Sequence, residues 1–133
     1  MWAKSWRSSM RRSKRRRRKI SVEDGREGGS LGGPMLVHTV YFWLKPELTS
    51  AQRAEFRRGV ESLGGIKAVT QIHVGVPAAT EKRPVIDDSY SVALTVICTD
   101  IAGHDAYQVD PLHLAFVGTF KTFWNRVQIY DAV

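Results

Sequence analysis

The sequence predicts a single α+β domain built around a four-stranded antiparallel sheet, and three observations carry this prediction. Two segments have the period-two pattern of strands, two further segments are assigned as strands, and regions with helical spacing lie between them. The chain has 133 residues, which is room for about one domain. Its charge is concentrated at one end, because residues 1–34 contain 11 Lys and Arg against 3 Asp and Glu, whereas the rest contain 9 against 10.

Residues 1–34 form an Arg-rich arm that we expect to be disordered, since so charged a segment cannot bury enough apolar surface to offset its ordering entropy. Three interpretations of the arm are open. It contacts nucleic acid or acts as a nuclear-import signal through the basic run at 14–19; it is a transit peptide; or translation starts at Met35. We favour the last interpretation and assign the folded domain to residues 35–133.

The first strand and the first helix are predicted within residues 35–63. The strand has a buried face at every second position, formed by Leu36, His38, Val40, Phe42 and Leu44. Thr49 and Gln52 have the spacing of a capping box, which predicts that a helix begins there. The helix continues to about Leu63, where two glycines end it, and its buried seam is Phe56, Val60 and Leu63.

The central part of the chain predicts two further strands. They are expected at Val69–Val76 and at Ser89–Cys98, and a polar loop from Thr80 to Asp88 separates them.

The last third of the chain predicts two consecutive helical segments and a closing strand. A short helix is expected at Ile101–Gln108, and a second begins with Asp110 as the N-cap and Pro111 at the first helical position. The final strand is expected at Arg126–Ala132. The buried seam of the second helical segment is assigned to Leu114, Val117, Phe120 and Trp124.

This order, β-α-β-β-α-β, is the ferredoxin-like arrangement, in which both helices cover one face of the sheet. The other face would leave an apolar patch larger than a monomer usually exposes. A second copy of the chain is its simplest partner.

Several runs of residues resemble the stress-responsive dimeric A/B barrel (Dabb) domain. They are Val37-His38-Thr39-Val40 in the first strand, the start of the first helix, and the segment YQVDPLHLAFVGTFKTFWNRVQIYD from Tyr107 to Asp131. The last contains a Tyr-x-x-x-Pro-x-His run followed by a Phe-Trp pair. The resemblance implies a homodimer whose two sheets face each other as a dimeric α/β barrel, with a small pocket in each half.

One branch of this family consists of plant polyketide cyclases, which close a linear polyketide with a His and a Tyr and use no cofactor. The resemblance implies that His113 is the catalytic base and Tyr107 the oxyanion donor, roles that suit an imidazole and a phenol in an aldol closure. Because His113 would be the third residue of its helix, we expect its pKa to be lowered. Substrate contacts are expected from His38, Val40, Phe42, Phe56 and Val60.

The sequence departs from the cyclase branch at the first helix and at the histidine run. Arg57 and Val60 occupy positions that are aromatic in the cyclases, and Asp110 stands where many family members have a second His. Asp110 and His113 are spaced like two metal ligands, but two ligands without a third do not define a site. No metal or other cofactor is therefore predicted.

A structural interpretation stands beside each functional one. His113 is either a helix-start residue bonding the preceding loop or a group that meets the ligand. Tyr107 is either a core residue or a donor, and His38 is either a sheet residue or a pocket wall. His73 and His104 are interpreted as solvated or structural, and Cys98 as a small buried hydrophobe. The large aromatic residues are expected in core and dimer packing: Trp43, Phe116, Phe120, Phe123 and Trp124.

Two functions are consistent with this sequence. The first is a small-molecule pocket protein of the Dabb type that acts as a cofactor-independent cyclase or lyase. The second is a non-enzymatic, stress-linked homodimer that binds a metabolite. One cysteine and no apolar signal or membrane segment favour a cytoplasmic protein without a membrane partner, and nucleic acid is expected to bind only through the basic arm.

Overall fold

A computed structural model describes residues 35–133, and the predictions made for residues 1–34 lie outside the described residues. Seven helices and strands and one 3-10 turn follow Met35 in the order β1-α2-η4-β2-β3-α3-α4-β4. Their bounds are β1 Leu36–Leu44, α2 Ser50–Ser62, η4 Leu63–Gly65, β2 Val69–Gly75, β3 Val92–Cys98, α3 Ile101–Val109, α4 Pro111–Phe120 and β4 Trp124–Ala132.

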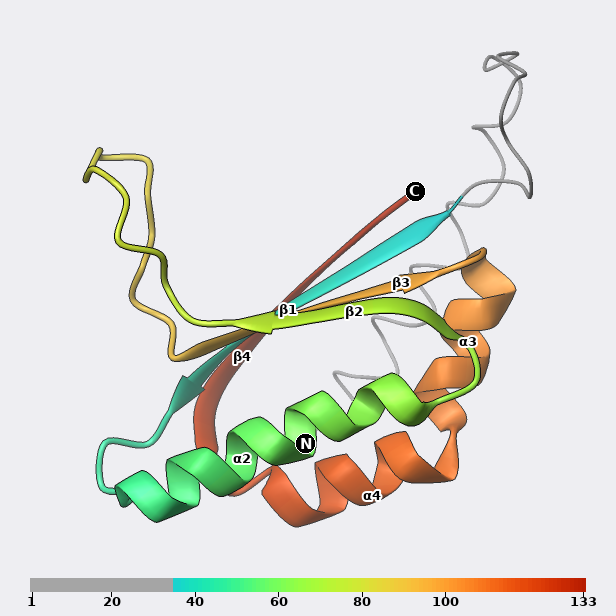
Figure 1. Ribbon diagram of the computed structural model, residues 1–133, viewed down its shortest axis with the longest axis horizontal. Coiled ribbons are helices and arrows are strands. Elements are labelled where there is room, and N and C mark those ends of the chain that lie inside the picture. The colour runs from blue at the N-terminus through green and yellow to red at the C-terminus, as the bar shows by residue number, and fades with distance from the viewer. Residues whose placement is uncertain (1–34) are drawn as a thin grey trace.

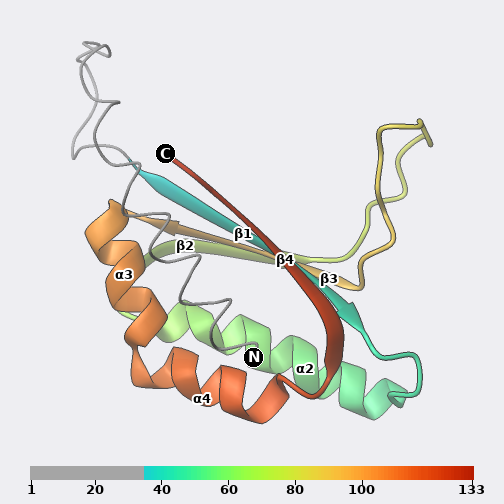
Figure 2. The ribbon, with the colours of Figure 1, turned by 180° about the vertical axis from the view of Figure 1, so that it is seen from behind.

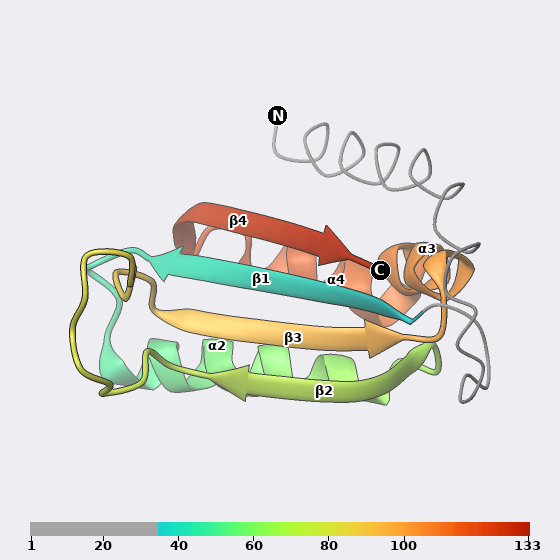
Figure 3. The ribbon, with the colours of Figure 1, turned by 90° about the horizontal axis from the view of Figure 1, so that it is seen from above.

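The four strands form one antiparallel sheet in the order β2-β3-β1-β4. Helices α2 and α4 lie side by side against one face, and α3 lies across one end of the sheet (Figure 1, and from behind in Figure 2). Figure 3 looks onto the opposite face, which no helix of the described residues covers. The predicted ferredoxin-like α+β fold is confirmed. None of the described helices is long and apolar enough to cross a membrane.

Helix α2 begins and packs as the sequence predicts. The Thr49 hydroxyl accepts a hydrogen bond from the Gln52 backbone N–H at 3.1 Å, and the Gln52 side chain accepts one from the Thr49 N–H at 2.8 Å. These bonds satisfy two donors that a helix start otherwise leaves unpaired. The predicted seam of Phe56, Val60 and Leu63 is fully buried against the sheet.

The last third of the chain also breaks where predicted. Pro111 disfavours helical backbone in the residue before it, so Asp110 is extended, with φ −64° and ψ 138°. The Asp110 carboxylate then accepts a hydrogen bond from the Leu112 N–H at 2.8 Å and caps α4.

The third strand begins at Val92, later than the alternation from Ser89 predicts.

The buried side of α4 differs from the predicted seam. His113, Phe116 and Phe120 face the core, whereas Leu114 is 56% exposed. Trp124, assigned to the same seam, is buried as the first residue of β4 and not in the helix. The helix is apolar on most sides, so the sequence offers no polar face from which its orientation could be read.

The uncovered face of the sheet carries aromatic side chains. The rings of Tyr41 and Tyr90 meet edge to face at 4.9 Å, and the Arg126 guanidinium lies 4.0 Å from the centre of the Trp43 ring. Ser89, in the loop between β2 and β3, accepts a hydrogen bond from the Trp43 indole at 3.0 Å. The lining of a hollow of about 310 Å³ on this face consists of Tyr41, Trp43, Asp87, Tyr90, Arg126, Gln128 and Tyr130.

Two helical glycines give a test of the packing between α2 and α4. A Cβ atom at Gly59 would lie 2.3 Å from Cε2 of Phe120, whose ring is buried among other aromatic rings. A Cβ at Gly118 would meet nothing within 4 Å. We therefore expect Gly59→Ala to destabilise the protein by about 1–3 kcal/mol through overpacking. Gly118→Ala should stabilise it by about 0.5–1 kcal/mol through helix propensity alone.

Urea unfolding of both variants, monitored by circular dichroism, measures the two changes. Equal effects of the two substitutions on the unfolding midpoint would contradict the close approach of α2 to α4.

Candidate functional site

Polar side chains gather where β1 begins, β4 ends and α3 gives way to α4. This is unusual in an otherwise apolar interior, because buried imidazoles and phenols lose hydration that hydrogen bonds must replace. The members come from β1, α3, α4 and β4, with two of them on α3, and the cluster consists of His38, His104, Tyr107, His113 and Asp131.

His38 and Asp131 form the shortest polar contact of this cluster. They are direct partners in the antiparallel pairing of β1 with β4, so their side chains emerge side by side on the helix-covered face. The Nδ1 atom of His38 lies 2.6 Å from Oδ1 of Asp131. The pairing leaves Nε2 as the atom that the His38 ring presents to the rest of the site.

His104 lies beside this pair, although the sequence suggested a solvated or merely structural role. Its side chain is 1% exposed, so the solvated interpretation is wrong. Its Nε2 atom is 3.2 Å from the Gln108 amide and 4.0 Å from Oδ2 of Asp131, and its Nδ1 is 3.5 Å from Oδ1 of Asp105. Burial, and next the neighbouring His38, lower the pKa of His104.

Tyr107 and His113 approach each other across the break between α3 and α4. Their ring centres are 4.8 Å apart, and the Tyr107 ring is 5.6 Å from that of His38. Tyr107 is fully buried, and its hydroxyl has no hydrogen-bond partner among the described residues. Burial raises the pKa of Tyr107, so the phenol keeps its proton and remains a donor.

His113 is the third residue of α4 and its side chain is buried. The expected lowering of its pKa is confirmed, to about 4. The cause differs from the expected one, because burial contributes most and His38 next, while the backbone of Gln108 acts in the opposite direction. The ring is therefore neutral at physiological pH.

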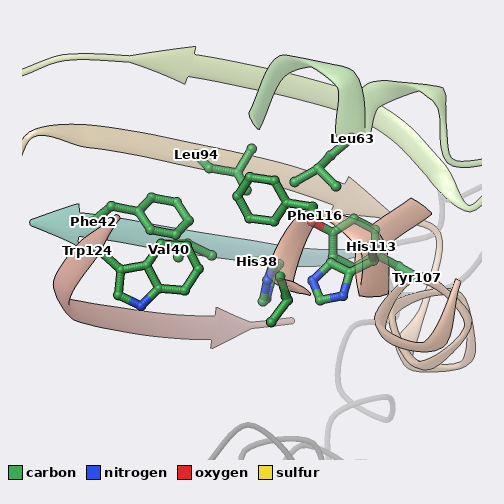
Figure 4. Close-up of a pocket in the computed structure, with 10 residues that line it drawn as sticks. His38, Val40, Phe42, Leu63, Leu94, Tyr107, His113, Phe116 and Trp124 are labelled. Atoms are coloured by element: carbon green, nitrogen blue, oxygen red, sulfur yellow. The ribbon is translucent and has the colours of Figure 1, made fainter. Parts of the chain in front are cut away.

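Tyr107, His113 and His38 share one small apolar cavity between the sheet and α4 (Figure 4). The space open to the centre of a water molecule is about 10 Å³, which is room for about one water. The cavity is lined by His38, Val40, Phe42, Leu63, Leu94, Tyr107, His113, Phe116, Val117 and Trp124.

The structure brings together five of the seven residues proposed from the sequence as catalytic or substrate-binding. Phe56 and Val60 are not among the lining residues and lie in the core on α2. The sequence missed Leu94, although the alternation in β3 places it on the same face as Val40, its partner in β1. It also missed His104 and Asp131, whose part in the site depends on contacts between distant segments. Cys98 is buried, as expected, and burial raises the pKa of its thiol to about 11, which disfavours the reactive thiolate at neutral pH.

Comparisons with known proteins agree with this fold. Residues 36–133 match the model of the stress responsive A/B barrel domain (Dabb). The chain belongs to this family. The Dabb relatives include olivetolic acid cyclase from Cannabis sativa, which is 23% identical over 95 residues and is matched over 71% of this chain and 91% of its own length.

Solved structures are similar over most of the Dabb domain. A Dabb family protein with a ferredoxin-like fold from Mesorhizobium loti has a TM-score of 0.62 at 27% identity, covering 74% of this chain and 95% of its own. Hydroxynitrile lyase from Passiflora edulis has a TM-score of 0.64 at 16% identity, and the match covers 74% of this chain and 91% of the lyase. A dimeric ferredoxin-like protein of unknown function from Thermobifida fusca has a TM-score of 0.61 at 16% identity, and the match covers 74% of this chain and 90% of that protein.

The lowered pKa of His113 predicts a pH-dependent stability. Between the unfolded pKa of about 6.5 and the folded pKa of about 4, the unfolded chain binds more protons, so stability is lost as the pH falls through this window. We expect the free energy of unfolding to decrease by about 2 kcal/mol from pH 7 to pH 5 through His113 alone.

Urea unfolding of the wild type and His113→Gln at pH 7 and pH 5 measures this contribution. The variant should retain only the part of the pH dependence that comes from other groups, His104 among them. An unchanged pH dependence in the variant would show that folding does not lower the pKa of His113.

Proposed function

We propose that this Dabb protein binds a small carbonyl compound in the cavity and catalyses a cofactor-independent cyclisation or a related lyase reaction. The observation that carries the proposal is the pairing of a neutral imidazole, His113, with an unpartnered phenol, Tyr107, in one small apolar cavity. A base and a donor facing one space are what a carbon–carbon bond rearrangement through an enolate requires.

His113 acts as the base in this proposal. Its ring is unprotonated at pH 7, so it is always in the form that accepts a proton. Its proton affinity is low in the resting site, because burial disfavours the imidazolium. An enolate forming beside the ring would raise the proton affinity of His113, since an adjacent negative charge favours the protonated imidazole.

Tyr107 acts as the donor to the developing oxyanion. Its hydroxyl is buried and has no hydrogen-bond partner in the part of the chain that the structure describes. An unpaired buried hydroxyl costs free energy in the resting protein, and a ligand oxygen that accepts a hydrogen bond from it would recover that cost. A hydrogen bond to an oxyanion is stronger than one to a neutral carbonyl oxygen, so the donor stabilises the charged state more than the ground state, which is the requirement for catalysis.

The remaining walls position the substrate. His38 presents its ring near Tyr107, and Val40 and Phe42 continue the same face of β1 into the apolar part of the cavity. The names of two relatives, a cyclase and a hydroxynitrile lyase, support a carbon–carbon bond reaction on this fold. Fold similarity alone does not transfer a reaction, so the proposal depends on the residues.

The size of the cavity favours a second candidate function. Space for about one water cannot hold a polyketide unless side chains such as Phe116 move. A non-enzymatic protein that binds a small metabolite, or whose pocket has lost its substrate, would be consistent with this volume.

We propose further that the chain forms a homodimer through the uncovered face of the sheet. The aromatic hollow on this face is suited to contact with a second copy, since Tyr and Trp are enriched in interfaces. The dimeric description of the Thermobifida fusca neighbour supports this assembly.

A reduced, buried Cys98 is consistent with the cytoplasmic location expected from the sequence.

Substitution of the two central residues tests the enzymatic proposal. With a linear poly-β-ketone and a 2-hydroxynitrile as trial substrates, we expect one to be turned over. Tyr107→Phe and His113→Gln should each lower kcat by about 10²–10³, as the loss of a donor or a base typically does. The control His73→Gln removes an exposed histidine and should leave the rate unchanged. With His113 as the base, kcat/KM should be flat from pH 6 to 8 and fall as the pH approaches 4.

Native mass spectrometry of protein from its own host supplies the complementary measurement, because it reports a retained ligand. No turnover of either substrate class together with a bound metabolite would favour the non-enzymatic function. Full activity of Tyr107→Phe would overturn the proposed donor role.

A charge on the uncovered face tests the proposed dimer. Tyr41→Glu places a carboxylate in the middle of the aromatic hollow, where dimer formation would have to desolvate it. We expect this variant to be monomeric by light scattering at concentrations where the wild type is dimeric. Ala54→Glu adds the same charge on the exposed side of α2 and should leave the mass unchanged. A dimeric Tyr41→Glu protein would place the interface elsewhere.

A further inference from the structure

We propose that His38, His104 and Asp131 form a binding site for a first-row divalent cation such as Zn²⁺. The inference does not depend on the proposed reaction, which needs no metal and whose base and donor are other residues, although His38 lines the cavity as well. It rests on three ligand-bearing side chains whose nitrogen and oxygen atoms all lie within 4.8 Å of one another. Both histidines are 1% exposed and Asp131 is 18% exposed, so the cluster is largely shielded from water.

The donor set is one that zinc and similar ions prefer. Two imidazole nitrogens and one carboxylate oxygen are a common three-ligand set for catalytic zinc and for non-haem iron. The amide of Gln108, 3.2 Å from Nε2 of His104, can turn its oxygen toward the same point, and a water is the other candidate for a fourth ligand. A bound cation would offset the Asp131 carboxylate at the edge of an apolar core.

A neighbouring carboxylate supports His104 as a ligand. In many metal sites a histidine that binds the metal through one nitrogen points its other nitrogen at a carboxylate, which fixes the ring and raises its basicity. Oδ1 of Asp105 lies 3.5 Å from Nδ1 of His104, on the side of the ring away from Asp131. This arrangement leaves Nε2 as the atom of His104 that faces the cluster.

The contact between His104 and Asp105 is also incomplete without a further charge. Both Nδ1 of His104 and Oδ1 of Asp105 are buried, and neither has a hydrogen-bond partner among the described residues. A cation on Nε2 would polarise the ring and strengthen the Nδ1–H group as a donor to Asp105. A cation bound to Nε2 of His104 would therefore complete this pair.

Binding would require small shifts of the ligand atoms. With metal–ligand bonds of about 2.0–2.1 Å, ligand atoms in a tetrahedral site are about 3.3 Å apart. The 4.0 Å between Nε2 of His104 and Oδ2 of Asp131 would shorten by about 0.7 Å. The 2.6 Å between His38 and Asp131 would lengthen by a similar amount, and the hydrogen on Nδ1 of His38 would move to Nε2 as the ring changes tautomer.

Titration of the full-length, chelator-treated protein with Zn²⁺ by calorimetry tests the site. We expect one Zn²⁺ per chain, weaker binding at pH 5.5 than at pH 7.5 because protonated imidazoles do not bind metal, and a higher melting temperature with Zn²⁺. Co²⁺ in its place should give visible absorption of a four- or five-coordinate N/O site.

Matched variants locate the binding. His104→Gln and Asp131→Asn should weaken Zn²⁺ binding by about 100-fold, and Asp105→Asn by about 10-fold, as loss of an outer carboxylate does. His73→Gln removes an exposed histidine outside the cluster and should bind as the wild type does. Zn²⁺ binding that survives His104→Gln, or that disappears in His73→Gln, would overturn the assignment. If His104→Gln does not fold, the wild-type Co²⁺ spectrum decides, because a spectrum like that of hydrated Co²⁺ would show that the cluster holds no metal.

Discussion

The bond between Asp110 and Pro111 is the constraint on which the candidate site depends. In one continuous helix, Tyr107 and His113 would be six positions apart, and their side chains would point about 120° away from each other. Pro111 prevents this continuation by forcing Asp110 into extended backbone, and the Asp110 carboxylate starts a new helix at once. As a result α3 and α4 meet at an angle, and their side chains converge on one cavity.

Burial then divides the site into two parts with different electrostatic character. Tyr107 and His113 lie among apolar residues, so both are held neutral. The Tyr107 phenol keeps its proton, and the His113 imidazole does not take up a second one. His38 and His104 flank the Asp131 carboxylate, which lies at the end of β4 with partial access to water. The ring of His38 belongs to both parts, because it contacts Asp131 through Nδ1 and lines the cavity beside Tyr107. A change of charge at Asp131 would therefore reach the cavity through His38.

The sequence predicted the features of this fold that depend on local physics. Alternation located β1, the Thr49–Gln52 capping box located α2, and Asp110-Pro111 located the start of α4. The orientation of α4 could not be predicted in the same way, because leucines and phenylalanines surround the helix and only the sheet decides which of them it buries. His104 was unpredictable for a related reason. Its role depends on Asp131, and nothing in the spacing of the two residues shows that α3 crosses the end of β4.

The small volume of the cavity constrains which chemistry the site can perform. Relatives of one fold carry the names of a cyclase and a lyase, so the reaction must be chosen by the side chains around the cavity and not by the sheet. In this chain the rings of Phe116 and Trp124 stack with their centres 6.1 Å apart. Together with Phe42 they fill the end of the cavity away from the histidines. A ligand must therefore either be very small or displace an aromatic ring from a tightly packed cluster. Because the polar residues sit at the other end, a displaced ring would open apolar space without disturbing Tyr107 and His113, and a carbonyl group could be held at the polar end while its chain occupies that space.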